Sequence, residues 1–243
     1  IDSIQNELFE MIGRLKSGGM RLEDTMNTKY ADMVDYYTMW VHQIKTPIAS
    51  MHLILQKEDS EDSRRLRAEL FRVEQYVQMV LCFLRLDSDF TDYVIKEYRV
   101  DDIIRPAVRR LAPQFIMKKL ALEYEHTDEV ALTDEKWLGF VVEQVLSNAV
   151  KYTSSGSISI KCDGDRLVIS DTGIGIAAED LPRIFDKGYT GFNGRADRKA
   201  SGIGLYLCRR ICDKLGHSIR AESVAGQGTT ITIGLGRNRL EVE

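Results

Sequence analysis

The 18 glycines are distributed very unevenly along the 243 residues, and this distribution constrains the fold more than any other feature. None lies between Gly19 and Gly139, whereas seven fall in the stretch from Gly173 to Gly204. Glycine marks tight turns and close approaches of the backbone. The glycine-free half therefore predicts long uninterrupted helix. The other half predicts a loop-rich domain of strands and helices with one special glycine region.

The glycine-free half carries a heptad pattern of apolar residues. They recur at a and d spacing, at Val34, Tyr37, Val41, Ile44, Ile48, Met51 and Leu55. A polar run over residues 57–63 separates this pattern from a second one over residues 66–84. Two amphipathic helices joined by a polar turn predict an antiparallel hairpin, and two hairpins make a four-helix bundle, so we expect a homodimer. The alternative is that the seam packs on the second domain of the same chain.

The remaining patterns divide the chain into three parts. Residues 1–28, which contain Gly13, Gly18 and Gly19, are expected to form an interrupted, weakly helical connector. Residues 29–88 are the hairpin, and residues 89–243 are the second domain. In that domain the patterns predict strands at 93–99, 122–126, 130–133, 157–163, 166–170, 218–223 and 229–235, and helices at 101–119, 134–151 and 201–215. This mixture predicts an α+β sandwich.

Composition excludes two classes of protein. The net charge of −4 argues against a protein whose main task is to coat nucleic acid. The longest apolar runs, such as residues 79–84, have six residues, whereas a membrane-spanning helix needs roughly 20. We therefore expect no membrane-spanning helix in this chain and no nucleic acid as its partner.

The first motif that carries chemistry lies in the hairpin at residues 42–47, with the sequence HQIKTP. His42 follows a core position of the heptad, so it faces outward. Pro47 cannot donate to the carbonyl of Gln43, which bends the helix at a cost of about 3 kcal/mol. Such a cost is easier to understand if the bend has a function. The alternative is an ordinary surface histidine beside a tolerated kink.

Three further motifs lie in the second domain, each with an ordinary structural alternative. Asn148 and Lys151 share one face at the end of a predicted helix, where they suit hydrated Mg²⁺ and phosphate. Residues 171–176, DTGIGI, follow a strand and place a carboxylate beside two glycines, which suits a flat ligand with an exocyclic amine. Residues 201–205, SGIGL, open a helix whose free N–H groups suit phosphates.

The stretch between the last two motifs, residues 187–200, combines three glycines with four cationic side chains, including Lys187 and Arg195. A glycine-hinged loop of this length is typical of a mobile lid. The dinucleotide-binding fingerprint and the Walker loop are both absent.

In this order and spacing the motifs resemble the cytoplasmic part of a bacterial sensor histidine kinase, over about residues 30–236. Residues 42–47 match the H-box, 148–152 the N-box, and Phe185 the F-box. The three glycine boxes correspond to residues 171–175, 201–204 and 226–229. Residues 37–43 and 185–191 also resemble the bacitracin-sensor, intramembrane-sensing subgroup. The resemblance implies a helical hairpin that forms a dimeric four-helix bundle, followed by an α/β sandwich of the GHKL type that binds ATP and Mg²⁺.

The same resemblance implies the roles of individual residues. His42 would accept the phosphoryl group, and Thr46 would position water for phosphatase activity. Gln43 stands where the family has an acidic residue. Gln144 stands where it has a first asparagine, and it keeps an amide oxygen that can join Asn148 as a Mg²⁺ ligand. The implied nucleotide-binding residues are Asn148, Lys151, Tyr152, Asp171, Gly173, Gly175, Lys187, Arg195, Ser201, Gly202, Gly204 and Thr229.

The implied activity is that of an ATP-dependent protein-histidine kinase, which passes the phosphoryl group to an aspartate of a response regulator. The subgroup resemblance adds an upstream membrane anchor and a peptide-transporting ABC permease as partner. Three alternatives stay open: an ATP-driven clamp, a catalytically weak scaffold or phosphatase, which Gln43 suggests, and a serine or threonine kinase of the same nucleotide fold.

Overall fold

The computed structural model describes the backbone of residues 2–57, 60–86, 93–191 and 201–236, and the side chains of these ranges from residue 11 onward. The chain separates into two compact units, residues 1–91 and 92–243. The finer division of the first unit into connector and hairpin stays a prediction.

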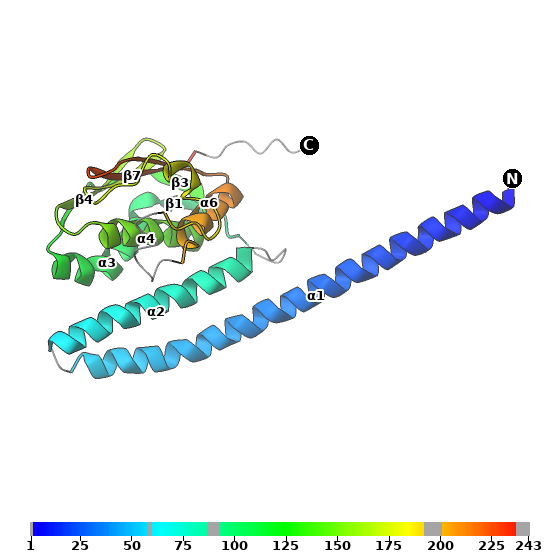
Figure 1. Ribbon diagram of the computed structural model, residues 1–243, viewed down its shortest axis with the longest axis horizontal. Helices are drawn as coiled ribbons and strands as arrows, with labels where there is room; N and C mark the ends of the chain where they lie inside the picture. Colours follow the sequence, from blue (N-terminus) through cyan, green and yellow to red (C-terminus); the bar gives the residue numbers. More distant parts are fainter. Residues whose placement is uncertain (1, 58–59, 87–92, 192–200, 237–243) are drawn as a thin grey trace. The chain divides into compact units, whose positions relative to one another are not determined.

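The first unit is a hairpin of two helices, α1 (Asp2–Leu55) and α2 (Glu61–Leu86), as Figure 1 shows. The fully buried Val41 of α1 packs with Val77 and Leu81 of α2. The two heptad patterns therefore form the antiparallel pair that the sequence predicts.

The expectation that glycines interrupt the first 28 residues was wrong. α1 runs without a break through Gly13, Gly18 and Gly19, and also through Pro47. A glycine costs only about 1 kcal/mol in a helix interior. A helix that is already nucleated extends over such positions, here to a length of 54 residues. Figure 1 shows α1 curving along its length. No helix in the described ranges has both the length and the apolarity that crossing a bilayer requires.

The heptad seam is only partly covered within one chain. Val41, Ile48 and Val77 are buried, whereas Tyr37 is 37% exposed and Met51 is 44% exposed. Large side chains at seam positions therefore stay exposed within the single chain. The homodimer stays a prediction that this exposure supports.

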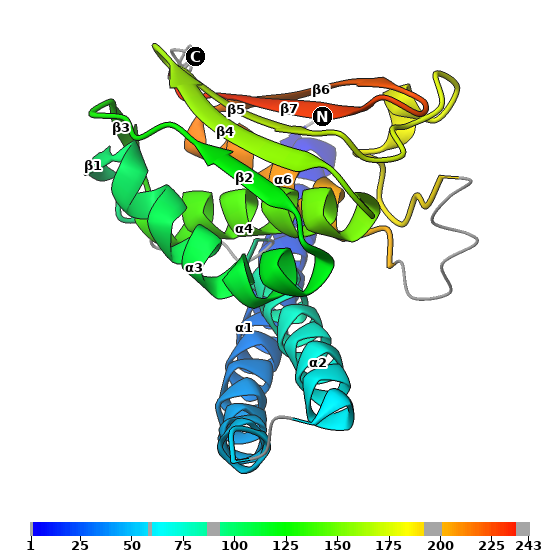
Figure 2. The ribbon, with the colours of Figure 1, turned by 90° about the vertical axis from the view of Figure 1, so that its left-hand side faces the viewer.

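The second unit is a five-stranded sheet with helices on one face (Figure 2). The strand order is β2-β4-β5-β7-β6, in which β2 and β4 are parallel and the other pairs antiparallel. The strands are β2 (Ala121–Tyr124), β4 (Ser157–Asp163), β5 (Arg166–Asp171), β6 (Ser218–Val224) and β7 (Gly228–Gly234). The helices are α3 (Val100–Lys118), α4 (Glu135–Tyr152) and α6 (Gly204–Leu215). A separate antiparallel pair joins β1 (Lys96–Arg99) to β3 (Val130–Thr133), and a short 3-10 helix covers Leu181–Arg183.

The core of the second unit lies between the sheet and the helices. The inward-facing aliphatic side chains of β4 and β5 are fully or almost fully buried, and so are those on the inner faces of α4 and α6: Ile158, Ile160, Leu167, Ile169, Leu138, Val141, Leu146, Leu207, Ile211 and Leu215. Period-2 alternation in the strands and a helical stripe in the helices produce this layer, as the sequence predicts. The α+β sandwich is confirmed.

Several element boundaries differ from the prediction, two of them by three residues. The strand expected at 93–99 begins only at Lys96. The last helix begins at Gly204 instead of Ser201, because Gly202 has a φ of +66°, in the left-handed region that a right-handed helix cannot contain. Lys119, with a φ of 55°, ends α3 one residue earlier than expected.

Candidate functional site

The carboxylate of Asp171 stands at the last position of β5, with one oxygen anchored and the other open. Its Oδ1 accepts the N–H groups of Gly173 over 2.8 Å and of Thr229 over 3.3 Å. No described residue donates a hydrogen bond to Oδ2. Burial raises the pKa of Asp171 above its ordinary value, and the two backbone N–H groups oppose that rise. The half-buried carboxylate therefore keeps one acceptor for a donor on a ligand.

The loop after Asp171 follows a path that requires glycine at two positions. A Cβ on Gly173 would lie 2.5 Å from the carbonyl oxygen of Tyr152. Gly175 has a φ of +65°, and its Cβ would lie 2.1 Å from the carbonyl oxygen of Val224. The glycines thus allow the backbone of the loop to lie directly against its neighbours.

The same loop is tied to the end of α4 on one side and to the β6–β7 turn on the other. The N–H of Ile174 donates to the Tyr152 carbonyl over 3.2 Å, and the carbonyl of Ile174 accepts the N–H of Gly226 over 2.8 Å. The hydroxyls of Thr229 and Ser223 lie 3.0 Å apart beside it. The N-box end and the first and third glycine boxes therefore meet at one place.

Helix α4 places three of the predicted polar side chains along one face, because Gln144, Asn148 and Lys151 are spaced four and three residues apart. Gln144 and Asn148 are half-buried, and their side-chain amides make no hydrogen bond with any described residue. A Cβ on Gly204 would lie 2.5 Å from Gln144 Nε2, so Gln144 packs on the first residue of α6. Lys151 is exposed, with its Nζ 5.0 Å from the centre of the Tyr152 ring.

The start of α6 leaves N–H groups available for an anion. The N-cap residue, Ile203, makes no side-chain hydrogen bond to the N–H groups of the first turn. Ser201 is exposed, and its hydroxyl accepts the Ile203 N–H over a long 3.4 Å. The carbonyl of Gly202 accepts the N–H of Gly188 over 3.0 Å, and a Cβ on Gly202 would lie 2.5 Å from the Gly188 carbonyl carbon. This contact fixes where the chain enters the helix.

The predicted lid is described only at its start. Lys187, its first residue, is exposed. Arg195 lies within residues 192–200, outside the described residues, so the lid and its Arg195 stay predictions.

The predicted residues of the helical unit share one exposed stretch of α1. His42, Gln43 and Thr46 are all exposed, and none of their side chains makes a hydrogen bond or ion pair with a described residue. The neighbouring Val41 is fully buried, so the heptad places His42 outward as predicted. These residues belong to a different unit from Asp171 and Asn148.

Sequence reasoning missed two residues beside the end of α4. Lys118, the last residue of α3, donates from Nζ to the carbonyls of Val150, Lys151 and Thr153 over 2.6 to 3.1 Å. Thr153 is fully buried, and its hydroxyl has no partner among the described residues. No periodic pattern marks either residue, because the contacts join positions more than 30 residues apart or arise only where the chain folds back.

Chemically, the assembled site offers one open carboxylate oxygen, two unpaired amide oxygens and a helix N-terminus. A carboxylate acceptor suits an exocyclic amine, and a helix N-terminus suits phosphate. Amide oxygens are hard ligands of the kind that Mg²⁺ takes together with water and substrate phosphate oxygens. The residues present therefore fit a nucleotide with its magnesium ion.

Comparison with known proteins gives consistent relatives. Residues 133–239 match the family described as "Histidine kinase-, DNA gyrase B-, and HSP90-like ATPase". The sensor histidine kinase YxdK of Bacillus subtilis is 33% identical over 234 residues, which are 93% of this chain and 72% of that protein. The sensor protein BceS of Halalkalibacterium halodurans is 33% identical over 237 residues, which are 95% of this chain and 69% of that protein.

Solved structures support the fold. The Acinetobacter baumannii histidine kinase AdeS matches with a TM-score of 0.55 and 20% identity, over 82% of this chain and 98% of that one. Full-length ShkA in complex with AMPPNP matches with a TM-score of 0.57 and 20% identity, over 85% of this chain and 47% of that one.

Proposed function

The chain belongs to the sensor histidine kinase family, and on that premise we propose that His42 receives the γ-phosphoryl group of ATP and passes it to an aspartate of a response regulator. The observation that carries the proposal is the carboxylate of Asp171. Only one of its oxygens accepts hydrogen bonds, while the loop beside it is held by hydrogen bonds to α4 and to the β6–β7 turn. A carboxylate held in this way, with its pKa raised by burial, is more readily understood as a ligand contact than as a structural one.

In the proposed complex, Asp171 Oδ2 accepts a hydrogen bond from the adenine amine. The loop through Gly173 and Gly175 lies beside the base, because it leaves no side chain in the way. The N-terminus of α6 faces the phosphates, and Lys151 adds a cation. Asn148 and Gln144 would hold Mg²⁺, which supplies charge neutralisation on the phosphate oxygens when it is bound. Lys187 and the predicted lid with Arg195 would complete the phosphate contacts.

The proposed reaction is a displacement at the γ-phosphorus. A ring nitrogen of His42 attacks, the nitrogen–phosphorus bond forms, and the bond to the bridging oxygen of ADP breaks. The imidazole loses its proton to solvent, and ADP leaves. Catalysis of this kind depends mostly on positioning and charge neutralisation. Gln43 can orient the imidazole through its amide oxygen, and Thr46, one turn later, would position a water for phosphatase activity.

The proposed partners follow from the family and the subgroup. We expect a homodimer through the exposed part of the heptad seam and a cognate response regulator as phosphoryl acceptor. We also propose that the chain is the cytoplasmic portion of a cell-membrane sensor and works with an ABC-type peptide transporter permease. The membrane anchor and the permease rest on the resemblance of residues 37–43 and 185–191 to the bacitracin-sensor subgroup.

One specific observation favours a second candidate, a weak kinase that acts mainly as a phosphatase or scaffold. Gln43 is exposed beside His42 and cannot take up a proton. An ATP-driven clamp would use the same nucleotide site without any need for His42.

Incubation of the full chain with γ-labelled ATP and Mg²⁺ separates these functions. We expect a label that is stable in alkali and labile in acid, as a phosphoramidate is. His42→Ala should abolish the label. His52→Ala is the matched control on the same helix and should keep it. A wild-type chain that hydrolyses ATP without acquiring the label, or a His42→Ala chain that still acquires it, would overturn the proposal.

A further inference from the structure

A hollow of about 410 Å³ lies on the second unit, away from the residues of the nucleotide site. It is lined by Arg105, Val108 and Arg109 of α3 and by Tyr124 and His126 at the end of β2. β2 is the edge strand of the sheet, separated from the strand of Asp171 by β4. The volume lies within the range of small-molecule sites, about 300 to 1,000 Å³.

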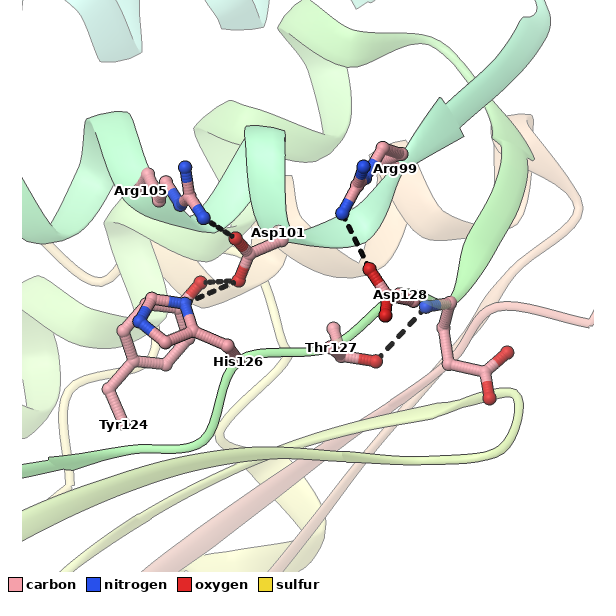
Figure 3. Close-up of polar contacts among 8 residues, drawn as sticks. Arg99, Asp101, Arg105, Tyr124, His126, Thr127 and Asp128 are labelled. Atoms are coloured by element: carbon pink, nitrogen blue, oxygen red, sulfur yellow. Dashed lines mark hydrogen bonds and ion pairs between the residues drawn. The ribbon is translucent and has the colours of Figure 1, made fainter.

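The buried carboxylate of Asp101 fixes the wall of this hollow (Figure 3). One of its oxygens accepts the Tyr124 hydroxyl and lies 3.2 Å from His126 Nδ1, and the other lies 2.6 Å from Arg105 Nη2. The Asp101 side chain is only 2% exposed. The Tyr124 and His126 rings lie against each other with centres 4.6 Å apart. Three side chains of the wall are therefore held in place before any ligand arrives.

Among the described residues, Asp101 is the one carboxylate that pairs with cationic side chains of this wall. The single negative charge of Asp101 compensates one positive charge, and both of its oxygens are already in contact with Tyr124, His126 or Arg105. Arg109 lies one turn after Arg105 and is exposed, and its side chain makes no hydrogen bond or ion pair with any described residue. The part of the His126 ring away from Nδ1 is also accessible to a ligand, because the side chain is 67% exposed while its Nδ1 faces Asp101. The wall thus combines an uncompensated guanidinium with an apolar surface formed by Val108 and the Tyr124 ring.

We propose that this hollow binds a small organic phosphate, with the phosphate between Arg105 and Arg109 and the apolar part of the ligand on Val108 and Tyr124. Two guanidinium groups one helical turn apart present more donors than a planar carboxylate can accept, whereas a phosphate monoester offers three oxygens. The pre-ordered wall lowers the cost of binding, because fewer side chains have to be immobilised.

Titration calorimetry of the full chain with phenyl phosphate tests the proposal. We expect saturable binding that is tighter than the binding of inorganic phosphate or benzoate. Arg109→Gln should weaken phenyl phosphate by about tenfold or more, since it removes charge-assisted hydrogen bonds. Arg220→Gln, an exposed arginine on the opposite edge strand β6, is the matched control and should change nothing.

The Asp171→Asn chain distinguishes this hollow from the nucleotide site. Phenyl phosphate should bind it as tightly as it binds the wild type. Loss of binding in Asp171→Asn would assign the ligand to the nucleotide site and overturn the proposal. The proposal also fails if the wild type shows no saturable binding or if Arg109→Gln binds with wild-type affinity. Equal affinity for inorganic phosphate would overturn the assignment to an organic phosphate.

Discussion

Two aspartates of the second unit, Asp101 and Asp171, occupy opposite kinds of surroundings. Asp101 is almost fully buried in the first turn of α3, and side chains from three directions use both of its oxygens. Asp171 is half-buried at the end of β5, where only backbone N–H groups contact it and only at one oxygen. The same type of side chain thus has partners at both oxygens in one region and at only one oxygen in the other.

The pKa values of the two carboxyl groups move in opposite directions. Burial alone would raise the pKa of Asp101, but the hydrogen bonds from Tyr124 and His126 and the charges of Arg105 and His126 outweigh it and lower that pKa. Burial raises the pKa of Asp171, and two backbone N–H groups do not offset it. A carboxylate that the fold satisfies adds stability when it is charged, whereas one that the fold leaves open costs stability. This contrast suggests that Asp171 is kept for a ligand.

The largest effect that we expect is the loss of stability in Asp101→Asn. An amide can still accept from Tyr124, but its N–H₂ group faces Arg105, so the free energy of unfolding should fall by about 3 kcal/mol. Trp40 and Trp137 are the two tryptophans, one in each unit. Urea unfolding followed by Trp137 fluorescence in a Trp40→Phe background therefore reports on the second unit. Asp102→Asn, the exposed neighbour in the same helical turn, should change little. An equal loss in both variants would mean that the helix end matters and the Asp101 contacts do not.

Asp171→Asn should do the reverse, with ATP affinity falling while stability does not. The amide oxygen can keep both backbone hydrogen bonds, but the N–H₂ group replaces the open acceptor and meets the adenine amine donor to donor. We expect the Kd for ATP with Mg²⁺, measured by calorimetry, to rise by about tenfold to a hundredfold. Asp163→Asn, an exposed carboxylate on β4, is the control. Unchanged ATP affinity, or a collapse of stability like that of Asp101→Asn, would erase the contrast between the two regions.

Acidification should remove the effect of each substitution on stability. The lowered pKa of Asp101 gives stability that is present above the unfolded pKa, about 3.9, and is lost as pH falls through the folded pKa. The raised pKa of Asp171 gives stability that is present below the unfolded pKa and is lost as pH rises through the folded one. Asp101→Asn should therefore be less stable than wild type at neutral pH, and Asp171→Asn equal or more stable. Both differences should shrink toward pH 3 in the same unfolding assay. Differences that keep their size would rule out ionisation as their source.

Helix α3, which carries Asp101 in its first turn, ends beside the region of Asp171, where Lys118 donates to three carbonyls at the end of α4. Lys118→Met leaves these carbonyls without their cation. It should lower the free energy of unfolding by about 1 to 2 kcal/mol and weaken ATP severalfold, because Asn148 and Lys151 lie on that last stretch of α4. Lys119→Met, the exposed neighbour, is the control for charge alone. If both variants behave alike, the three hydrogen bonds do not position the site.

The sequence predicts some parts of this comparison much better than others. Strands β3 and β4 match their predicted bounds to the residue, because alternating apolar residues end at clear turn signals. The motif residues of Asp171 and its loop were found because they are contiguous in the chain. Asp101 was expected only as the first residue of a helix, and Lys118 was not singled out at all. Their partners are between 4 and 35 residues away and come together only through tertiary packing, which leaves no local period in the sequence.

Gln43 extends the comparison to a position where the expected carboxylate is missing, and there we expect the smallest effect. An acidic side chain would accept a hydrogen bond from one ring nitrogen of His42, leave the other nitrogen free to attack, and take up the released proton. The Gln43 amide oxygen can accept the same hydrogen bond, so orientation survives, but the amide cannot take a proton. General-base assistance is typically worth about 10²- to 10⁴-fold. Phosphoryl transfer depends mostly on positioning and charge neutralisation, and the Gln43 amide already orients the His42 ring. Gln43→Glu should therefore raise the single-turnover rate of His42 phosphorylation only severalfold. ATP affinity should not change, because Gln43 is exposed on α1 and the nucleotide site is built from the other unit.

Gln43→Asn is the matched control: it keeps the amide, moves it by one methylene, and should not accelerate the reaction. A rate that stays the same or falls in Gln43→Glu would assign Gln43 to partner recognition or to the phosphatase reaction.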